Sequence, residues 1–278
     1  MSRLAAITDT SPEALRVLID CYRRMPLERK WRILGDSYRF ARILHASGMR
    51  LRKSSATEDD IRRDWAATHS EKASLEANGS TSPMHSQPVE HQEVIRSVLD
   101  AFEKSQIKVA IGGSIASSLF GVPRYTHDAD LTAEDFSGRE GPFVQLFDAD
   151  YYVSLAAVRE ANQRNGSFNI IHLPSGFKVD VFILKSRAFD QNLLQRRIIT
   201  TELDPSGRPI AVLSPEDILL HKLEWFRLGG EVSDRQWEDV LGVLRVQGER
   251  LDGNYLDQWA KELGVSDLLT EARADAAI

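Results

Sequence analysis

Cysteine is almost absent from this chain. Cys21 is the only one among 278 residues, which excludes an intrachain disulfide and a zinc site built from several cysteines. No apolar run approaches the roughly 18 residues that would span a bilayer, and the first residues lack the apolar stretch of a signal peptide. The motifs of P-loop NTPases, zincins and serine hydrolases are also missing. We therefore expect a cytoplasmic protein without membrane contact.

The charge of the chain is unevenly distributed. The net charge is -6, but residues 1–70 carry fourteen Lys and Arg against nine Asp and Glu, which leaves the remainder at -11. A weakly basic N-terminal part could contact nucleic acid or attract the acidic remainder. An arginine-rich, solvated helix surface would give the same composition, so both interpretations stay open. Hydrophobic residues make up 42% of the chain, enough for at least one core.

The apolar pattern divides the chain into four parts. Residues 1–68 carry three amphipathic helical patterns and are expected to form an all-α head. Residues 69–91 lose their apolar content to Ser, Asn, Gly, Pro and Gln, which predicts a flexible linker. Residues 92–213 alternate between strand and helix patterns and form the core. Residues 214–278 are expected to be a helical C-terminal part of the same domain.

Individual elements can be placed within these parts. In the head, Ser11 is a helix cap, a second helix should run from Leu27 to about Ser47 and end at Gly48, and Thr57 should open a third. Strands are expected at residues 107–111, 128–132, 168–173, 178–184, 198–203 and 209–213. Helices near Val144 and Ala156 and from Pro215 onward complete the pattern. The sequence therefore predicts a mixed α/β (α+β) fold, with a small mixed sheet flanked by helices.

A glycine pair lies where the first core strand should turn into a helix. Gly112 and Gly113, followed by Ser114, would let the backbone approach a ligand closely while the amide groups of the helix start face an anion. A phosphate group could bind there. Glycine pairs also occur at such turns without any ligand, so the pair alone leaves the question open.

Three aspartates are candidate metal ligands. Asp128 and Asp130 stand two apart on a strand, so both point to one side, roughly 7 Å apart at the backbone. Such a pair is unfavourable without a cation, and hard oxygen donors suit Mg²⁺. Asp180 lies in an apolar strand, where a buried carboxylate needs a partner. The three could share a metal pair, although Asp180 could also lie alone at a sheet edge or pair with an arginine.

Two cations could face the same region. Lys222 interrupts the apolar stripe of the helix that begins at Pro215, so its ammonium either extends to solvent or reaches a triphosphate. Arg124, four residues before Asp128, is the second candidate for neutralising phosphate charge. His127 stands next to the acids, but neighbouring residues on a strand face opposite ways, which argues against its being a ligand.

Taken together, these residues resemble the motif of the polymerase-β-type nucleotidyltransferase superfamily. The similarity is greatest to its minimal bacterial branch around the AbiEii toxins, which carry a G-G-[ST] turn, an R-x-T-x-D-x-D strand and a later h-D-h strand. The matching segments here are Gly112-Gly113-Ser114, Arg124 to Asp130, Val179-Asp180-Val181, Ser214-Pro215-Glu216-Asp217 with Lys222, and Asp234 to Val240. The resemblance covers roughly residues 92–245. A longer gap between Lys222 and Asp239 departs from the family pattern, and residues 1–68 lie outside it.

The resemblance implies an enzyme that moves NMP from a nucleoside triphosphate to an acceptor hydroxyl. Two Mg²⁺ ions would be held by Asp128, Asp130 and Asp180, and Asp180 could also take the proton of the hydroxyl. The nucleotide-binding residues would be Gly112, Gly113, Ser114, Arg124, Thr126 and Lys222, with Thr126 limited to a supporting hydrogen bond. RNA, a protein side chain or a small molecule, including an antibiotic, could be the acceptor, and a toxin–antitoxin role is suggested.

A second hypothesis belongs to a different class of protein. The same fold could be catalytically inactive and act as a regulatory or binding protein whose helical head docks a cognate protein partner. The presence of all three acids favours the enzyme, but an intact set of acids can exist without an acceptor site.

Overall fold

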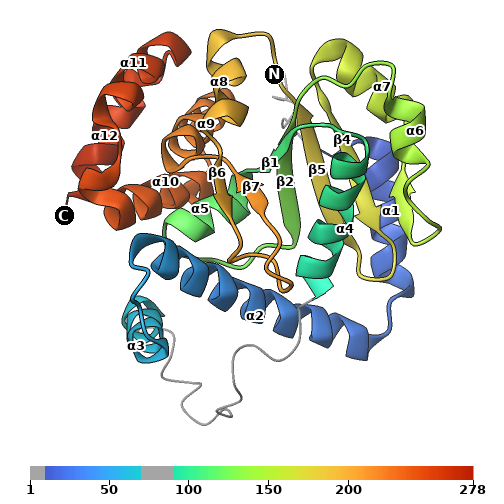
Figure 1. The fold of residues 1–278 in the computed structure, drawn as a ribbon, viewed down its shortest axis with the longest axis horizontal. Helices are drawn as coiled ribbons and strands as arrows, with labels where there is room; N and C mark the ends of the chain where they lie inside the picture. The colour runs from blue at the N-terminus through green and yellow to red at the C-terminus, as the bar shows by residue number, and fades with distance from the viewer. Residues whose placement is uncertain (1–9, 70–89, 278) are drawn as a thin grey trace.

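A seven-stranded mixed sheet lies at the centre of the molecule (Figure 1). The computed structural model describes residues 10–69 and 90–277. Along the sheet the strand order is β3-β4-β5-β2-β1-β7-β6. The strands are β1 (Val109–Ile111), β2 (Asp128–Ala133), β3 (Tyr151–Val153), β4 (Ser167–His172), β5 (Phe177–Ile183), β6 (Ile198–Thr200) and β7 (Ile210–Val212). The predicted mixed α/β class, with helices around a mixed sheet, is thus confirmed.

The sheet combines local hairpins with parallel pairs that are distant in sequence. β4 and β5 pair antiparallel across the turn at Pro174-Ser175-Gly176, and β6 pairs antiparallel with β7. β2 is parallel to β5, and β1 is parallel to β7 and antiparallel to β2. The pairing of β2 with β5 places side chains about fifty residues apart in sequence next to one another, which positions the candidate acids.

Helices surround this sheet. They are α1 (Pro12–Arg24), α2 (Leu27–Arg52), α3 (Glu58–His69), α4 (Glu90–Lys104), α5 (Gly113–Phe120), α6 (Glu140–Val144), α7 (Leu155–Arg164), α8 (Ala188–Arg196), α9 (Pro215–Leu228), α10 (Asp234–Gln247), α11 (Gly253–Leu263) and α12 (Ser266–Ala276), with the 3₁₀ turn η2 (Gly248–Arg250). No helix in the described part of the chain combines the length and apolar character needed to cross a membrane.

The predicted helix starts in the head are correct, but one predicted end is wrong. The Ser11 hydroxyl accepts a hydrogen bond from the Ala14 amide, and Thr57 and Asp60 form a reciprocal capping box. Gly48 does not end α2, which continues to Arg52. A Cβ at Gly48 would lie 2.0 Å from the carbonyl oxygen of Leu119, so this glycine permits close helix packing instead.

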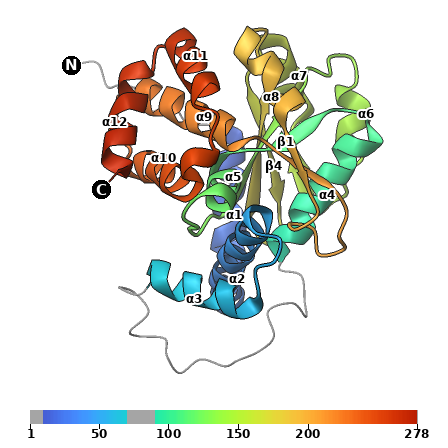
Figure 2. The same cartoon turned by 60° about the vertical axis from the view of Figure 1, so that its left-hand side comes forward.

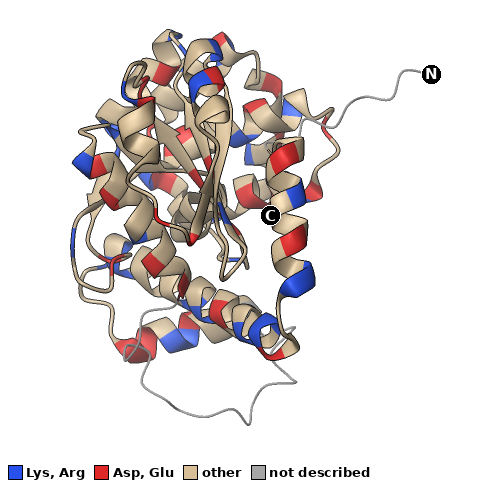
Figure 3. Ribbon diagram, turned by 90° about the vertical axis from the view of Figure 1, so that its right-hand side faces the viewer, with Lys and Arg blue, Asp and Glu red and all other residues tan. Residues whose placement is uncertain are grey.

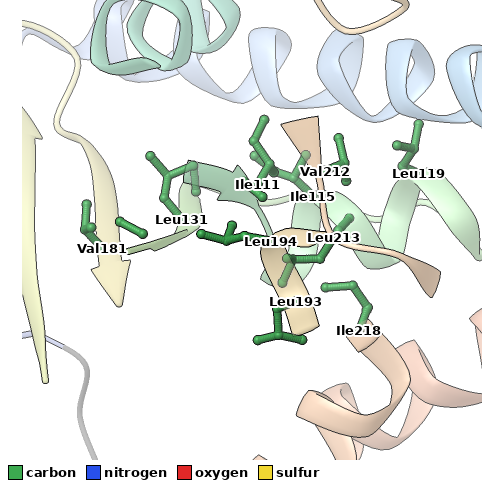
Figure 4. Close-up of a cluster of buried hydrophobic side chains, with 14 of the residues drawn as sticks. Ile111, Ile115, Leu119, Leu131, Val181, Leu193, Leu194, Val212, Leu213 and Ile218 are labelled. Carbon is green, nitrogen blue, oxygen red and sulfur yellow. The ribbon is translucent and has the colours of Figure 1, made fainter. Parts of the chain in front are cut away.

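The head helices pack directly on the sheet-containing part of the chain. α2 runs below the sheet with α3 beside it (Figure 2). Its buried Phe40 and Leu44 belong to the same hydrophobic cluster as the side chains of α4, α5 and the strands. Figure 4 shows a part of this core, in which Leu131 and Val181 of the sheet, Ile115 of α5 and Leu194 of α8 are labelled. The four-part division proposed from the sequence remains a prediction, and nearly all of its linker lies outside the described residues.

Charges of both signs are interspersed along the helices (Figure 3). Several arginines of the head form ion pairs with acids of the same helix, as in Arg39 with Asp36 and Arg63 with Asp60. Arg50 of α2 contacts Glu58 of α3. Much of the positive charge in the head is therefore balanced locally, which fits a solvated helix surface.

Candidate functional site

The register of three strands brings the candidate acids to one face of the sheet. Asp128 and Asp130 of β2 stand opposite Lys178 and Asp180 of β5, respectively, in a parallel pair. Asp180 in turn stands opposite Asn169 of β4. Because paired residues point to the same side of a sheet, all five side chains share one face. We call these five residues the acid row.

One end of the acid row contacts the glycine corner between β1 and α5. The backbone at Gly113 has a φ of +50°, and a Cβ there would lie 1.6 Å from Oδ2 of Asp130. The Ser114 amide donates to the same oxygen at 3.3 Å. Only glycine fits this position, for reasons of both conformation and space. The predicted corner at residues 112–114 therefore packs directly against one of the predicted acids.

Asp128 accepts a hydrogen bond from Thr126, the residue to which the sequence analysis assigned a supporting hydrogen bond. The hydroxyl of Thr126 donates to Oδ1 of Asp128 at 2.6 Å, and Thr126 itself is buried. His127 points elsewhere and lies near Ser37 of α2, with 3.3 Å between the Ser37 hydroxyl and Nδ1 of the histidine. This agrees with the expectation that His127 faces away from the acids.

Both predicted cations meet at one buried carboxylate. Arg124 donates to Asp239 of α10 through Nε at 2.7 Å and Nη2 at 3.0 Å. Nζ of Lys222 lies 2.7 Å from the same carboxylate. Nη2 of Arg124 also donates to the hydroxyl of Ser114 at 2.5 Å. The lysine therefore does not extend to solvent, and both cations are fixed beside the glycine corner.

The pKa shifts of Asp239 and Arg124 favour the charged form of each. Burial raises the pKa of Asp239, but the hydrogen bond from Arg124 and the charge of Lys222 outweigh it, so the net shift is downward. Burial likewise lowers the pKa of Arg124, and Asp239 more than compensates. Asp128 and Asp130 add to the upward shift of the Arg124 pKa, which places the guanidinium within electrostatic reach of both acids.

Asp180 lies in a different environment from the other two acids. It is fully buried, and its Oδ1 accepts a hydrogen bond from Nδ2 of Asn169 at 2.6 Å. Its Oδ2 accepts from Nζ of Lys178 at 2.5 Å. The sequence-based alternative was pairing with an arginine, and the observed partner is a lysine two residues away on the same strand.

The start of α1 covers this end of the acid row. The Ser11 amide donates to Oδ1 of Asn169 at 3.0 Å, and Lys178 donates to the Thr10 hydroxyl at 2.8 Å. On the other face of the sheet, His91 of α4 stacks on Phe177 of β5. The two helices therefore lie on opposite faces, as Figure 1 shows.

The donor set fits one divalent cation better than two. Asp128 and Asp130 are half-buried carboxylates on one face, and Mg²⁺ commonly takes one or two carboxylates and completes its shell with phosphate and water. Both oxygens of Asp180 already have protein partners. Within residues 10–69 and 90–277, no group of three His, Cys, Asp or Glu side chains is arranged to hold a metal. A two-ion site that includes Asp180 does not fit this arrangement.

Three important residues were not assigned a role from the sequence. Asp239 lies in the helical segment quoted for the family resemblance, but nothing local reveals which cations it binds. Lys178 could have been found, because a residue two before Asp180 on a strand must share its face. Asn169 could be found only by counting the hairpin register back from the turn at residues 174–176.

Ser214-Pro215-Glu216-Asp217 has a structural role at the start of α9. The Ser214 hydroxyl accepts from the Asp217 amide and donates to the Asp217 carboxylate at 2.8 Å. Tyr255 donates to the same buried carboxylate at 2.6 Å. Burial is the main reason that the pKa of Asp217 is raised. This segment therefore fixes the start of the helix that presents Lys222.

No protein-family model and no curated protein matches this chain. The solved structures similar to it include the following three. The solution structure of the antibiotic-resistance factor ANT(2'')-Ia is 18% identical, with a TM-score of 0.40 over 67% of this chain and 94% of that one. The crystal structure of ANT(2'')-Ia in complex with adenylyl-2''-tobramycin is 17% identical, with a TM-score of 0.42 over 67% of this chain and 97% of that one. An antigenic nucleotidyltransferase-like protein from Paracoccidioides brasiliensis is 18% identical, with a TM-score of 0.46 over 67% of this chain and 90% of that one.

Proposed function

We propose that this protein is a nucleotidyltransferase that moves NMP from a nucleoside triphosphate to an acceptor hydroxyl. The observation that carries the proposal is the meeting of three parts at one place. Asp130 packs on the glycine corner, Ser114 of that corner contacts Arg124, and Arg124 shares Asp239 with Lys222. Carboxylates, a glycine corner and fixed cations are the three kinds of group that phosphoryl transfer requires.

Each group has a role that follows from its chemistry. The backbone at Gly112 and Gly113 and the start of α5 would hold phosphate oxygens through amide groups. Arg124 and Lys222 would balance the charge that develops as pyrophosphate leaves, and Asp239 keeps both in place before the nucleotide arrives. A divalent cation at Asp128 and Asp130, when bound, would neutralise phosphate charge near the reacting phosphorus.

Asp180 would take the proton of the acceptor hydroxyl. It is fully buried beneath the Thr10–Ser11 segment, so an acceptor reaches it only when the start of α1 moves aside. This covered state is also the specific observation that favours the second candidate function, a catalytically inactive protein of the same fold with a binding role.

Isothermal titration tests the nucleotide site. We expect a nucleoside triphosphate to bind only with Mg²⁺, and we expect Asp128→Asn to abolish this Mg²⁺-dependent binding. Gly113→Ala should also prevent binding, because its Cβ would displace the Asp130 carboxylate. Asp59→Asn, at an exposed aspartate of α3, is the matched control and should bind as wild type does. Binding that is absent, or unaltered in Asp128→Asn, would contradict the proposal.

Labelled substrates separate the acceptors and the two candidate functions. The full chain is incubated with each of the four α-labelled nucleoside triphosphates and with total RNA, an aminoglycoside, or no addition. Label on RNA would support the toxin-type role, label on the protein would indicate a protein acceptor, and label on the aminoglycoside would indicate antibiotic modification. Nucleotide binding without transfer to any of them would favour the inactive, partner-binding alternative.

A further inference from the structure

Lys178 provides a positive charge within the acid row. It stands opposite Asp128 in the parallel pair of β2 with β5, and two residues before Asp180 on the same strand face. Its Nζ contacts Oδ2 of Asp180 at 2.5 Å, and only 10% of its side chain is exposed. An ion pair this deeply buried is costly to break, because water cannot easily replace the lost partner of either charge.

Two further contacts fix the pair. Asn169 donates to the second oxygen of Asp180 at 2.6 Å, so the carboxylate cannot rotate without losing a hydrogen bond. The Thr10 hydroxyl accepts from Lys178, and the Ser11 amide donates to Asn169. Both partners of Asp180 are thus held by the residues that precede α1.

We propose that Lys178 takes the place of one of the two divalent cations, so that the site binds a single divalent cation at Asp128 and Asp130. Lys178 is then a positioning residue that holds Asp180 as an ion-paired carboxylate. The inference rests on the proposed function, because that function assigns a cation to Asp128 and Asp130.

The charges of the acid row agree with a single cation. Within the acid row itself, one ammonium and one divalent cation carry three positive charges, which equal the three negative charges of the carboxylates. A second divalent cation at Asp180 would have to displace the lysine and two contacts that hold it. Ligand exchange of this kind is unfavourable when the displaced ammonium is nine-tenths buried.

Manganese binding tests the inference with a readout other than activity. The full chain is titrated with Mn²⁺ in the absence of nucleotide, and free Mn²⁺ is measured by electron paramagnetic resonance. Wild-type protein should bind one ion per chain, and Asp128→Asn should bind none. Lys178→Met should gain a second ion at the Asp180 carboxylate, which the lysine then no longer contacts, whereas Lys178→Arg should keep one.

The possible outcomes separate this inference from the proposed function. Two ions bound to wild type, or a folded Lys178→Met that still binds one, would overturn the single-cation site. Wild-type protein that binds no Mn²⁺ would overturn the inference alone, because the proposed function is tested separately by the titration of nucleoside triphosphate with Mg²⁺. Lys178→Met removes the ammonium that Asp180 contacts, which can prevent folding. The double variant Lys178→Met with Asp180→Asn avoids this cost and serves as the second test. It should bind one ion with the affinity of wild type, and a large loss of affinity would show that Asp180 is a ligand.

Discussion

His91 is a titratable side chain inside the hydrophobic core. It stacks on Phe177 with 4.6 Å between ring centroids and contacts Phe40 edge to face. Burial is the main cause that lowers its pKa to about 4, the charge of His127 acts in the same direction, and Asp36 opposes both. The histidine is therefore neutral in the folded protein at pH values where it would be protonated in the unfolded chain.

His91→Phe should remove a part of the acid sensitivity of the fold. Since the folded pKa lies below the unfolded value near 6.5, the unfolded state binds more protons between pH 6.5 and about 4. The contribution of neutral His91 to the free energy of unfolding is fully present above pH 6.5 and decreases as the pH falls toward 4. We expect wild type to lose as much as about 3 kcal/mol more than His91→Phe between pH 7 and pH 4.

Urea denaturation of both proteins at pH 8, 7, 6, 5 and 4 measures this difference. At pH 8 the phenyl ring should retain the stacking on Phe177, so the two free energies of unfolding should be similar. Parallel pH profiles for the two proteins would show that His91 does not titrate as inferred.

Side chains whose position depends only on local periodicity were predictable from the sequence. The common face of Asp128 and Asp130 follows from their spacing on a strand, and the turn at Gly112 and Gly113 follows from the residue type. The position of Asp180 beside Asp130 was not predictable in this way, because it depends on the register of β2 with β5. The role of Asp239 depends on how α10 packs, which no local pattern fixes.

At the scale of elements, α2 and α5 approach each other closely at Gly48. The carbonyl oxygen of Leu119 occupies the space where a side chain at position 48 would begin. The oxygen belongs to the backbone of α5, so it cannot move without moving the helix. Gly35 lies in the same helix, and a Cβ added there would have no atom within 4 Å, so this position serves as a matched control.

Gly48→Ala should destabilise the protein, and Gly35→Ala should not. Forcing α2 away from α5 is an overpacking change that costs about 1–3 kcal/mol or more. The control gains helix propensity and should stabilise the protein by about 0.5–1 kcal/mol. Guanidinium denaturation followed by circular dichroism gives both values. Equal effects at the two positions would show that the helices are not in close contact.

The elements themselves were largely evident from the sequence. All six predicted strands exist, and the hairpin of β4 with β5 follows from its turn. β3 was missed because its three residues, Tyr151–Val153, are too few to show a period. α8 was missed for a different reason, since its buried residues include Asp190, a polar residue in the middle of its apolar pattern. The strand order could not be predicted, because parallel pairs form between distant segments.

At the scale of the whole molecule, the head and the remainder share one hydrophobic cluster. Phe40 and Leu44 of α2 are buried in it, and Leu44 is fully inaccessible to solvent. Residues that share a core unfold together in most single domains of modest size. The head should therefore not unfold as an independent unit, although the sequence suggested a separate helical part.

Leu44→Ala should destabilise the entire protein. Removing a fully buried leucine costs about 2–5 kcal/mol, depending on how far the neighbouring side chains collapse. The transition should shift as one step, with tryptophan fluorescence and circular dichroism giving the same midpoint. Leu34→Ala, at an exposed leucine of the same helix, is the control and should change the free energy of unfolding little. Two separate transitions, with only one affected by Leu44→Ala, would contradict a shared core.

The ion pair of Arg124 with Asp239 joins two residues 115 positions apart. During synthesis on the ribosome, the segment that carries the three aspartates emerges well before α10. A nascent chain therefore already contains the three aspartates, while Arg124 and Lys222 still lack Asp239, the carboxylate that fixes both cations. Contacts between such distant residues form late in folding. We expect incomplete chains that stop before residue 239 to lack an ordered form of the proposed triphosphate site, so that any transfer activity begins only after most of the polypeptide has been made.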